Sequence, residues 1–206
     1  MTGPAMTGPT MRRDWMDWGT ASVLGALDRL GDDELDAPTV LPGWTRRHVV
    51  AHVHHNAEAL RRLASWACTG VESPMYPSAT QRNNDIETGS TLPASELRAL
   101  AHASSAALAT DLDALDAAMW ARPVVTAQGR TVPASEIVWM RTREVVVHAV
   151  DLAAGDGFGF GDVPSDLAKA LLGEILARRV GRGETALLGP WLTGRATDAA
   201  TLPPWI

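Results

Sequence analysis

Four of the chain's six histidines lie within eight positions, in the stretch LPGWTRRHVVAHVHHNAEAL that covers residues 41–60. Residues four apart on a helix share a face, because each residue advances by about 100 degrees. His48, His52 and His55 would therefore lie in one stripe, with His54 pointing away. Neutral imidazoles are ligands for zinc and similar divalent ions, so this stripe is a candidate half of a metal site.

A second stretch repeats this spacing later in the chain. In REVVVHAVDL, Glu144 and His148 lie four residues apart. Together the two stretches offer imidazoles and a carboxylate, and a catalytic zinc site typically has three such protein ligands and one open position. Each pair also occurs as an ordinary polar contact on a helix surface, so the spacing alone leaves a polar patch as the alternative.

Composition narrows the class of protein. The 206 residues suit one compact domain with a small appendage, and 46% hydrophobic with 20% charged residues is typical of a folded globular chain without a membrane span. The formal charge of -6 and the scattered basic residues argue against a nucleic-acid partner. Cys68 is the only cysteine, which excludes an internal disulfide and a Cys-rich zinc site. The sequence has no recognisable secretory signal, and a cytoplasmic location fits best.

Helical patterning dominates the elements that must position these residues. Apolar residues at three- and four-residue steps predict four long helices, over residues 15–30, 45–69, 93–120 and 133–155. Thr45 is a suitable N-cap for the second helix. Residues 70–90 are expected to form a long excursion with a short helical piece near Arg82, and residues 122–132 a small hairpin or loop. The prediction is an all-α, up-and-down four-helix bundle, whose interior can house a metal site.

The two ends of the chain are predicted to lie outside the helical bundle. We expect residues 1–13 to be a disordered leader, residues 14–162 the metal-binding bundle, and residues 163–206 a reduced C-terminal segment with a helix over 165–180. Glycines at 155, 157, 159 and 161 interrupt the chain before that helix. Their spacing resembles a phosphate loop, but no buried strand precedes them and no Lys-Ser/Thr follows, so phosphate binding is not expected.

Three stretches resemble the mycothiol-dependent maleylpyruvate isomerase family, whose N-terminal part is a DinB-like metal-binding four-helix bundle. They are the histidine-containing stretch above, ESPMYPSATQRNNDI and VTAQGRTVPASEIVWMRTREVVVHAVDL. The resemblance implies that the metal ligands are His52, Glu144 and His148, and so selects one histidine of the first stretch. His48 and Asn56 also match family positions, as supporting residues rather than ligands.

The resemblance also implies the cofactors and the reaction. The cofactors are a divalent metal, for which zinc is well suited while nickel, cobalt, iron and manganese are compatible, and mycothiol, the small thiol of actinobacteria. The thiolate would bind at the open metal position and add to the alkene carbon of maleylpyruvate. Rotation about the resulting single bond and loss of the thiolate would give fumarylpyruvate, in gentisate breakdown. Cys68 is then not needed as the nucleophile.

Arginines supply the candidate substrate contacts, because the guanidinium fork suits carboxylates. Arg82 and Arg195 lie where the resemblance suggests the catalytic, substrate-binding arginines, although Arg82 also reads as a solvated loop charge and the match around Arg195 is short. Asp151 could orient the ring of His148 or be a surface residue. Three more arginines could bind an anion, although an exposed position accounts for each: Arg130, Arg141 and Arg143.

The match weakens towards the C-terminus. The family usually carries a C-terminal α/β domain, and the 44 residues of 163–206 leave room only for a short remnant of it. An apolar PPWI end and a shortened tail are compatible with a homodimer. Three functions stay open: the isomerase, a mycothiol S-transferase acting on an electrophilic toxin or biosynthetic intermediate, and a non-enzymatic metal-binding or stress-response bundle.

Overall fold

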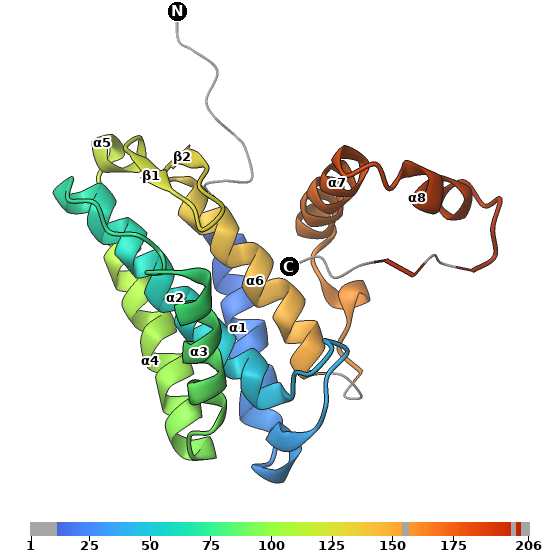
Figure 1. Ribbon diagram of the computed structural model, residues 1–206, viewed down its shortest axis with the longest axis horizontal. Helices are drawn as coiled ribbons and strands as arrows, with labels where there is room; N and C mark the ends of the chain where they lie inside the picture. The colour runs from blue at the N-terminus through green and yellow to red at the C-terminus, as the bar shows by residue number, and fades with distance from the viewer. Residues whose placement is uncertain (1–11, 154–156, 199–200, 203–206) are drawn as a thin grey trace, which may run out of the picture. The chain divides into compact units, whose positions relative to one another are not determined.

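The computed structural model describes residues 12–153, 157–198 and 201–202, and it is predominantly helical (Figure 1). The chain divides into two compact units, with the boundary between Gly159 and Phe160. No helix within the described ranges is both long and apolar enough to span a bilayer. The predicted all-α fold is confirmed.

Four long helices build the first unit. They are α1 (Arg13–Arg29), α2 (Arg46–Thr69), α4 (Ala94–Asp113) and α6 (Glu136–Leu152). Helix α2 packs against both α4 and α6, and α1 packs against α6 (Figure 1). Each long helix turns an apolar stripe inward, as the spacing of its apolar residues requires. The four-helix bundle expected from the periodicity is therefore present.

A capping box fixes the start of α2. The Thr45 side chain accepts a hydrogen bond from the backbone N–H of His48, and Nδ1 of His48 accepts one from the backbone N–H of Thr45 at 3.2 Å. These bonds satisfy two backbone donors that a helix N-terminus leaves unpaired. The predicted N-cap is confirmed, and the side chain of His48 takes part in capping the helix.

Helix α3 (Ala79–Ser90) is longer than the short helical piece expected near Arg82. The Ser78 side chain caps it by accepting a hydrogen bond from the backbone N–H of Gln81 at 3.0 Å. Its sequence carries only a weak apolar stripe, and few of its residues are buried. Its packing against α2 determines the helix, and it brings Arg82 to the bundle.

The third long helix ends earlier than its alanine-rich sequence suggests. Helix α4 stops at Asp113, and a separate short helix, α5 (Ala117–Trp120), follows it. The Asp116 side chain caps α5 by accepting a hydrogen bond from the backbone N–H of Met119 at 2.8 Å. The expectation of one helix continuing to Trp120 is wrong, because this aspartate begins a new helix.

The predicted hairpin is confirmed as β1 (Pro123–Val125) and β2 (Thr131–Pro133). The two strands are antiparallel, with Val124 opposite Val132. Val124 is fully buried and anchors the hairpin to the core. The turn between the strands has Gly129 at φ +75°, a left-handed conformation that glycine adopts without strain.

Two clusters of buried apolar side chains fill the bundle, and polar residues separate them. The first cluster takes residues 57–67 of α2 and 137–140 of α6, and the second takes 49–53 and 145–152 of the same helices. The buried polar residues between these stretches include Asn56, Arg141 and Thr142. The bundle therefore has a polar layer across its middle.

The second unit is helical over its described residues. It contains a short 3₁₀ helix, η3 (Phe160–Asp162), then α7 (Ser165–Gly181) and α8 (Thr185–Leu192). A second 3₁₀ helix, η2 (Asp33–Asp36), lies in the first unit after α1. Arg179 and Glu184 form an ion pair at 2.7 Å that ties the end of α7 to the start of α8. The helix expected over 165–180 is confirmed by α7.

Gly19 allows α1 to approach α6 closely. A Cβ at this position would lie 2.7 Å from Cγ2 of Val145 and 2.9 Å from Cγ2 of Val146. We therefore expect Gly19→Ala to lower the free energy of unfolding by about 1 to 3 kcal/mol through overpacking, as measured by urea denaturation. Gly25→Ala in the same helix is the control, since the nearest atom to its Cβ would be Nη1 of Arg29 at 3.5 Å. Equal stability of the two variants would contradict this packing argument.

Candidate metal centre

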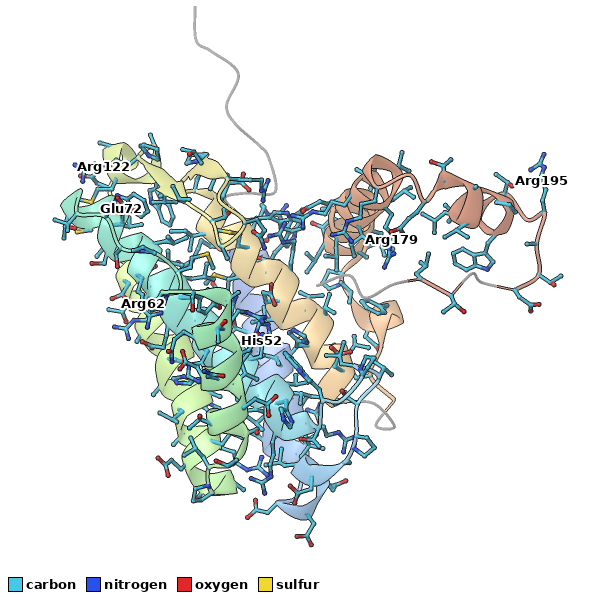
Figure 2. All side chains as sticks on the ribbon, in the orientation of Figure 1. His52, Arg62, Glu72, Arg122, Arg179 and Arg195 are labelled. Carbon is cyan, nitrogen blue, oxygen red and sulfur yellow. The ribbon has the colours of Figure 1, made fainter. Side chains whose placement is uncertain are left out.

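Three side chains from two helices converge in the middle of the bundle, where Figure 2 labels His52. Each of His52, Glu144 and His148 offers one ligand atom, and these atoms all lie within 4.8 Å of one another. Nε2 of His52 lies 2.9 Å from Oε2 of Glu144, and Nε2 of His148 lies 3.5 Å from the same oxygen. The four-residue spacing on α6 directs the carboxylate and the second imidazole to the same side, towards α2.

The burial of this triad fits a cation site. The side chains of His52, Glu144 and His148 are 3%, 15% and 0% exposed. Nε2 of His148 is buried and makes no hydrogen bond, a state that costs about 1 to 3 kcal/mol and that a bound cation would offset. Two imidazoles and a carboxylate form a donor set suited to zinc and similar ions. Among the described residues, no other cluster of three such side chains lies this close together.

Asp151 orients His148. Its Oδ2 lies 2.8 Å from Nδ1 of the ring, and the aspartate is itself buried. Burial disfavours the charged imidazole, but the hydrogen bond to Asp151 and the interaction with Glu144 outweigh it and raise the pKa of His148 to about 9. Nδ1 therefore donates to the aspartate and Nε2 faces the centre, where a bound cation would replace the proton that Nε2 carries near pH 7. The surface alternative for Asp151 is excluded.

His52 and Glu144 have the charge states that a cation requires. Burial lowers the pKa of His52 to about 4, so its ring is neutral near pH 7. Burial would raise the pKa of Glu144, but the interaction with the neighbouring His148 ring and the hydrogen bond from His52 hold that pKa well below its usual value. The carboxylate is therefore ionised. The centre combines a negative oxygen with a neutral nitrogen in a site largely shielded from water.

Arg82 joins this centre from α3. Its Nη2 lies 3.3 Å from Nδ1 of His52, and its Cζ lies 5.9 Å from the centroid of the Tyr76 ring. The alternative of a solvated loop charge is wrong, because Arg82 is half-buried and belongs to a helix that packs against α2. The guanidinium therefore places a positive charge in contact with the triad.

Arg195 lies in the second unit, in the turn after α8. It is exposed and donates a hydrogen bond to the carbonyl oxygen of Thr193 at 3.1 Å. Its assignment to the substrate site stays a prediction.

The remaining histidines of the cluster have other environments. His48 caps α2, and its Nε2 lies 3.4 Å from Oε2 of Glu87. The rings of His54 and His55 contact each other, with centroids 4.7 Å apart. Trp44, which the sequence did not single out, lies beside the centre with its ring centroid 5.6 Å from that of His52. Of the four clustered histidines, His52 alone belongs to the described triad.

Arg141 is buried at 1% exposure, so the expectation of an exposed position is wrong. It donates hydrogen bonds to the backbone carbonyl of Val53 and to Oδ1 of Asn56, both at 2.8 Å, and to Oγ of Ser105 at 3.0 Å. Burial lowers its pKa to about 10, which leaves it charged near pH 7. Because Arg141 lies two helical turns before His148, its place on the inner face of α6 was readable from the spacing.

Comparison with known proteins agrees with this geometry. Residues 3–153 match the family model described as the mycothiol maleylpyruvate isomerase N-terminal domain. An uncharacterized protein from two strains of Mycobacterium tuberculosis is 28% identical over 172 residues, which cover 84% of this chain and 76% of that protein. Crystal structures of the mycothiol-dependent maleylpyruvate isomerase and of its H52A mutant match with a TM-score of 0.76 and 43% identity, over 82% of this chain and 72% of theirs. This chain therefore belongs to the mycothiol maleylpyruvate isomerase N-terminal domain family.

Proposed function

We propose that this protein is a mycothiol-dependent cis-trans isomerase that converts maleylpyruvate to fumarylpyruvate, with a divalent ion held by His52, Glu144 and His148. The observation that carries the proposal is the buried triad, in which Nε2 of His148 has no hydrogen-bond partner, in a chain whose sequence is 43% identical to that of such an isomerase over 82% of its length. Zinc suits the two imidazoles and one carboxylate. A cytoplasmic location and a homodimer stay predictions.

The charge of the triad supports binding of an anionic sulfur. A divalent cation in this site would keep a net positive charge, because only one of the three side chains is a carboxylate. It would therefore favour the thiolate over the thiol at a free coordination position. Addition of the mycothiol thiolate to the alkene of maleylpyruvate would leave a single bond that can rotate, and expulsion of the thiolate would give the trans product. The protein's part is to hold the reactants in place and to stabilise the negative charge that develops.

The contact between Arg82 and His52 supports a role for this arginine in binding that negative charge. A neutral imidazole carries one proton, so a His52 ring that binds a cation through Nε2 carries this proton at Nδ1. Nδ1 could then no longer accept the hydrogen bond from Arg82. The guanidinium would be available for a substrate carboxylate or an enolate oxygen beside the centre.

A turnover assay tests this proposal. The zinc-loaded protein, its chelator-treated form and a zinc-only control are each given maleylpyruvate with and without mycothiol. We expect a product of unchanged mass and different chromatographic retention only when the zinc-loaded protein and mycothiol are both present. Accumulation of a mycothiol conjugate would instead identify an S-transferase, and no reaction of maleylpyruvate under any condition would refute the isomerase. Readdition of zinc to the chelated protein is expected to restore turnover.

A further inference from the structure

A pocket of about 360 Å³ lies within the first unit, next to the candidate metal centre. Its walls come from α2, the segment before α3, the start of α3 and the β1–β2 turn, and they include Trp66, Tyr76, Arg82, Thr126, Ala127 and Gly129. The volume falls within the range of roughly 300 to 1,000 Å³ that is usual for small-molecule sites. The pocket is large enough for part of an organic ligand.

Arg82 connects this pocket to the triad. It lines the pocket, and its Nη2 contacts Nδ1 of His52 at 3.3 Å. Its guanidinium also lies near the ring of Tyr76, another wall residue. A ligand in the pocket that extends past Arg82 would therefore approach His52 and the other two metal-binding candidates.

The wall combines flat apolar surfaces with hydrogen-bonding groups. Trp66 and Tyr76 provide aromatic surfaces, and Ser78 and Thr126 provide hydroxyl groups. Glu72 adds a carboxylate at an exposed position. Such a wall suits a ring compound that has C–H groups on its faces and hydroxyls around its edge, because the faces pack on aromatic rings while the hydroxyls form hydrogen bonds.

We propose that this pocket binds the polyhydroxylated sugar and cyclitol body of mycothiol while the sulfur of the same molecule reaches the metal centre. The inference rests on the proposed function, and it adds the part of the protein that would distinguish mycothiol from a smaller thiol. Binding of the body would position the sulfur, so the pocket would contribute affinity and orientation rather than reactivity.

A second cleft, of about 450 Å³, does not compete for this role. It lies along α2 and the end of α4, where Arg61 pairs with Asp111 at 2.7 Å and Cys68 lines the wall. It shares no lining residue with the pocket at Arg82, and none of the three metal-binding candidates lines it. This cleft therefore provides a matched control.

Filling the pocket is the direct test. Ala127 is exposed in the β1–β2 turn, so Ala127→Leu adds volume to the wall without removing a core side chain. Calorimetry on the zinc-loaded protein would compare mycothiol with N-acetylcysteine, which carries the thiol without the sugar and cyclitol rings. We expect the wild type to bind mycothiol at least tenfold more tightly, and Ala127→Leu to lose about tenfold in mycothiol affinity with N-acetylcysteine affinity unchanged.

Two further variants keep the result interpretable. Ala114→Leu makes the same substitution at an exposed position of the second cleft and should leave both affinities unchanged. Trp66→Leu removes an aromatic wall and should repeat the selective loss, which supports the proposal if Ala127→Leu fails to fold. Retention of the full preference for mycothiol in folded Ala127→Leu and Trp66→Leu would overturn the pocket assignment alone. Failure of the wild type to bind either thiol would refute the proposed function as well.

Discussion

Replacing His52 with alanine is expected to abolish stoichiometric zinc binding while the bundle stays folded. The triad takes one side chain from α2 and two from α6, so this substitution leaves only the Glu144–His148 pair on a single helix. Loss of one of three protein ligands should weaken zinc binding more than the roughly 10- to 100-fold expected for loss of a supporting contact. Competition with a chromophoric chelator and elemental analysis of the dialysed protein would measure this loss.

His54→Ala is the matched control for that experiment. His54 lies on the same helix, and it is outside the triad. This variant should keep about one zinc ion per chain, and circular dichroism should show equal helix content in both variants. Zinc bound at wild-type affinity by folded His52→Ala would refute the assignment of His52 as a ligand.

Replacing Arg141 with methionine is expected to lower both the stability of the bundle and its affinity for zinc. The variant keeps much of the aliphatic volume but leaves the Val53 carbonyl, the Asn56 amide oxygen and the Ser105 hydroxyl without their cationic donor. The loss of these buried hydrogen bonds should cost about 2 to 4 kcal/mol of unfolding free energy. Urea denaturation in the presence of a chelator would measure this change without a contribution from zinc.

The effect of Arg141 on zinc binding follows from its place between the two helices of the centre. It lies three residues before Glu144 on α6, and it binds the carbonyl of Val53, the residue after His52 on α2. Loss of this link should let α2 and α6 shift, and so weaken zinc binding by about tenfold even at temperatures where the variant is folded. Arg130→Met, at an exposed position of the β1–β2 turn, should change neither quantity. Wild-type zinc affinity in folded Arg141→Met would show that Arg141 has only a stabilising role.

The local structure could be predicted from the sequence because it depends on residues that are neighbours along the chain. The four-residue step from Glu144 to His148 places both side chains on one side of any helix, whatever packs against it. Thr45 likewise caps α2 through residues of the first turn. The hairpin and the four long helices follow from the same local rules. Helix α3 was predicted incompletely, because its sequence has little apolar periodicity and its packing against α2 supplies what the sequence lacks.

The choice among the clustered histidines shows where the sequence pattern stops. Spacing puts His48, His52 and His55 in one stripe and gives no reason to prefer one of them as a partner for α6. His48 takes part in the capping box, whereas His52 reaches Glu144, a residue 92 positions away. Only the family resemblance selected His52 before the fold was considered, and the packing of α2 against α6 now supplies the physical reason.

The sequence by itself determined the positions of the four long helices, the hairpin, the donor types and the shared face of Glu144 and His148, because helix geometry and capping act over a few residues. Tertiary structure alone decided that His52 meets that face, that Asp151 is buried and that Arg82 contacts the centre. These facts depend on which helix faces cover each other. Burial also changes the chemistry of the groups concerned, because removal from water lowers the pKa of His52 while a buried aspartate partner raises that of His148.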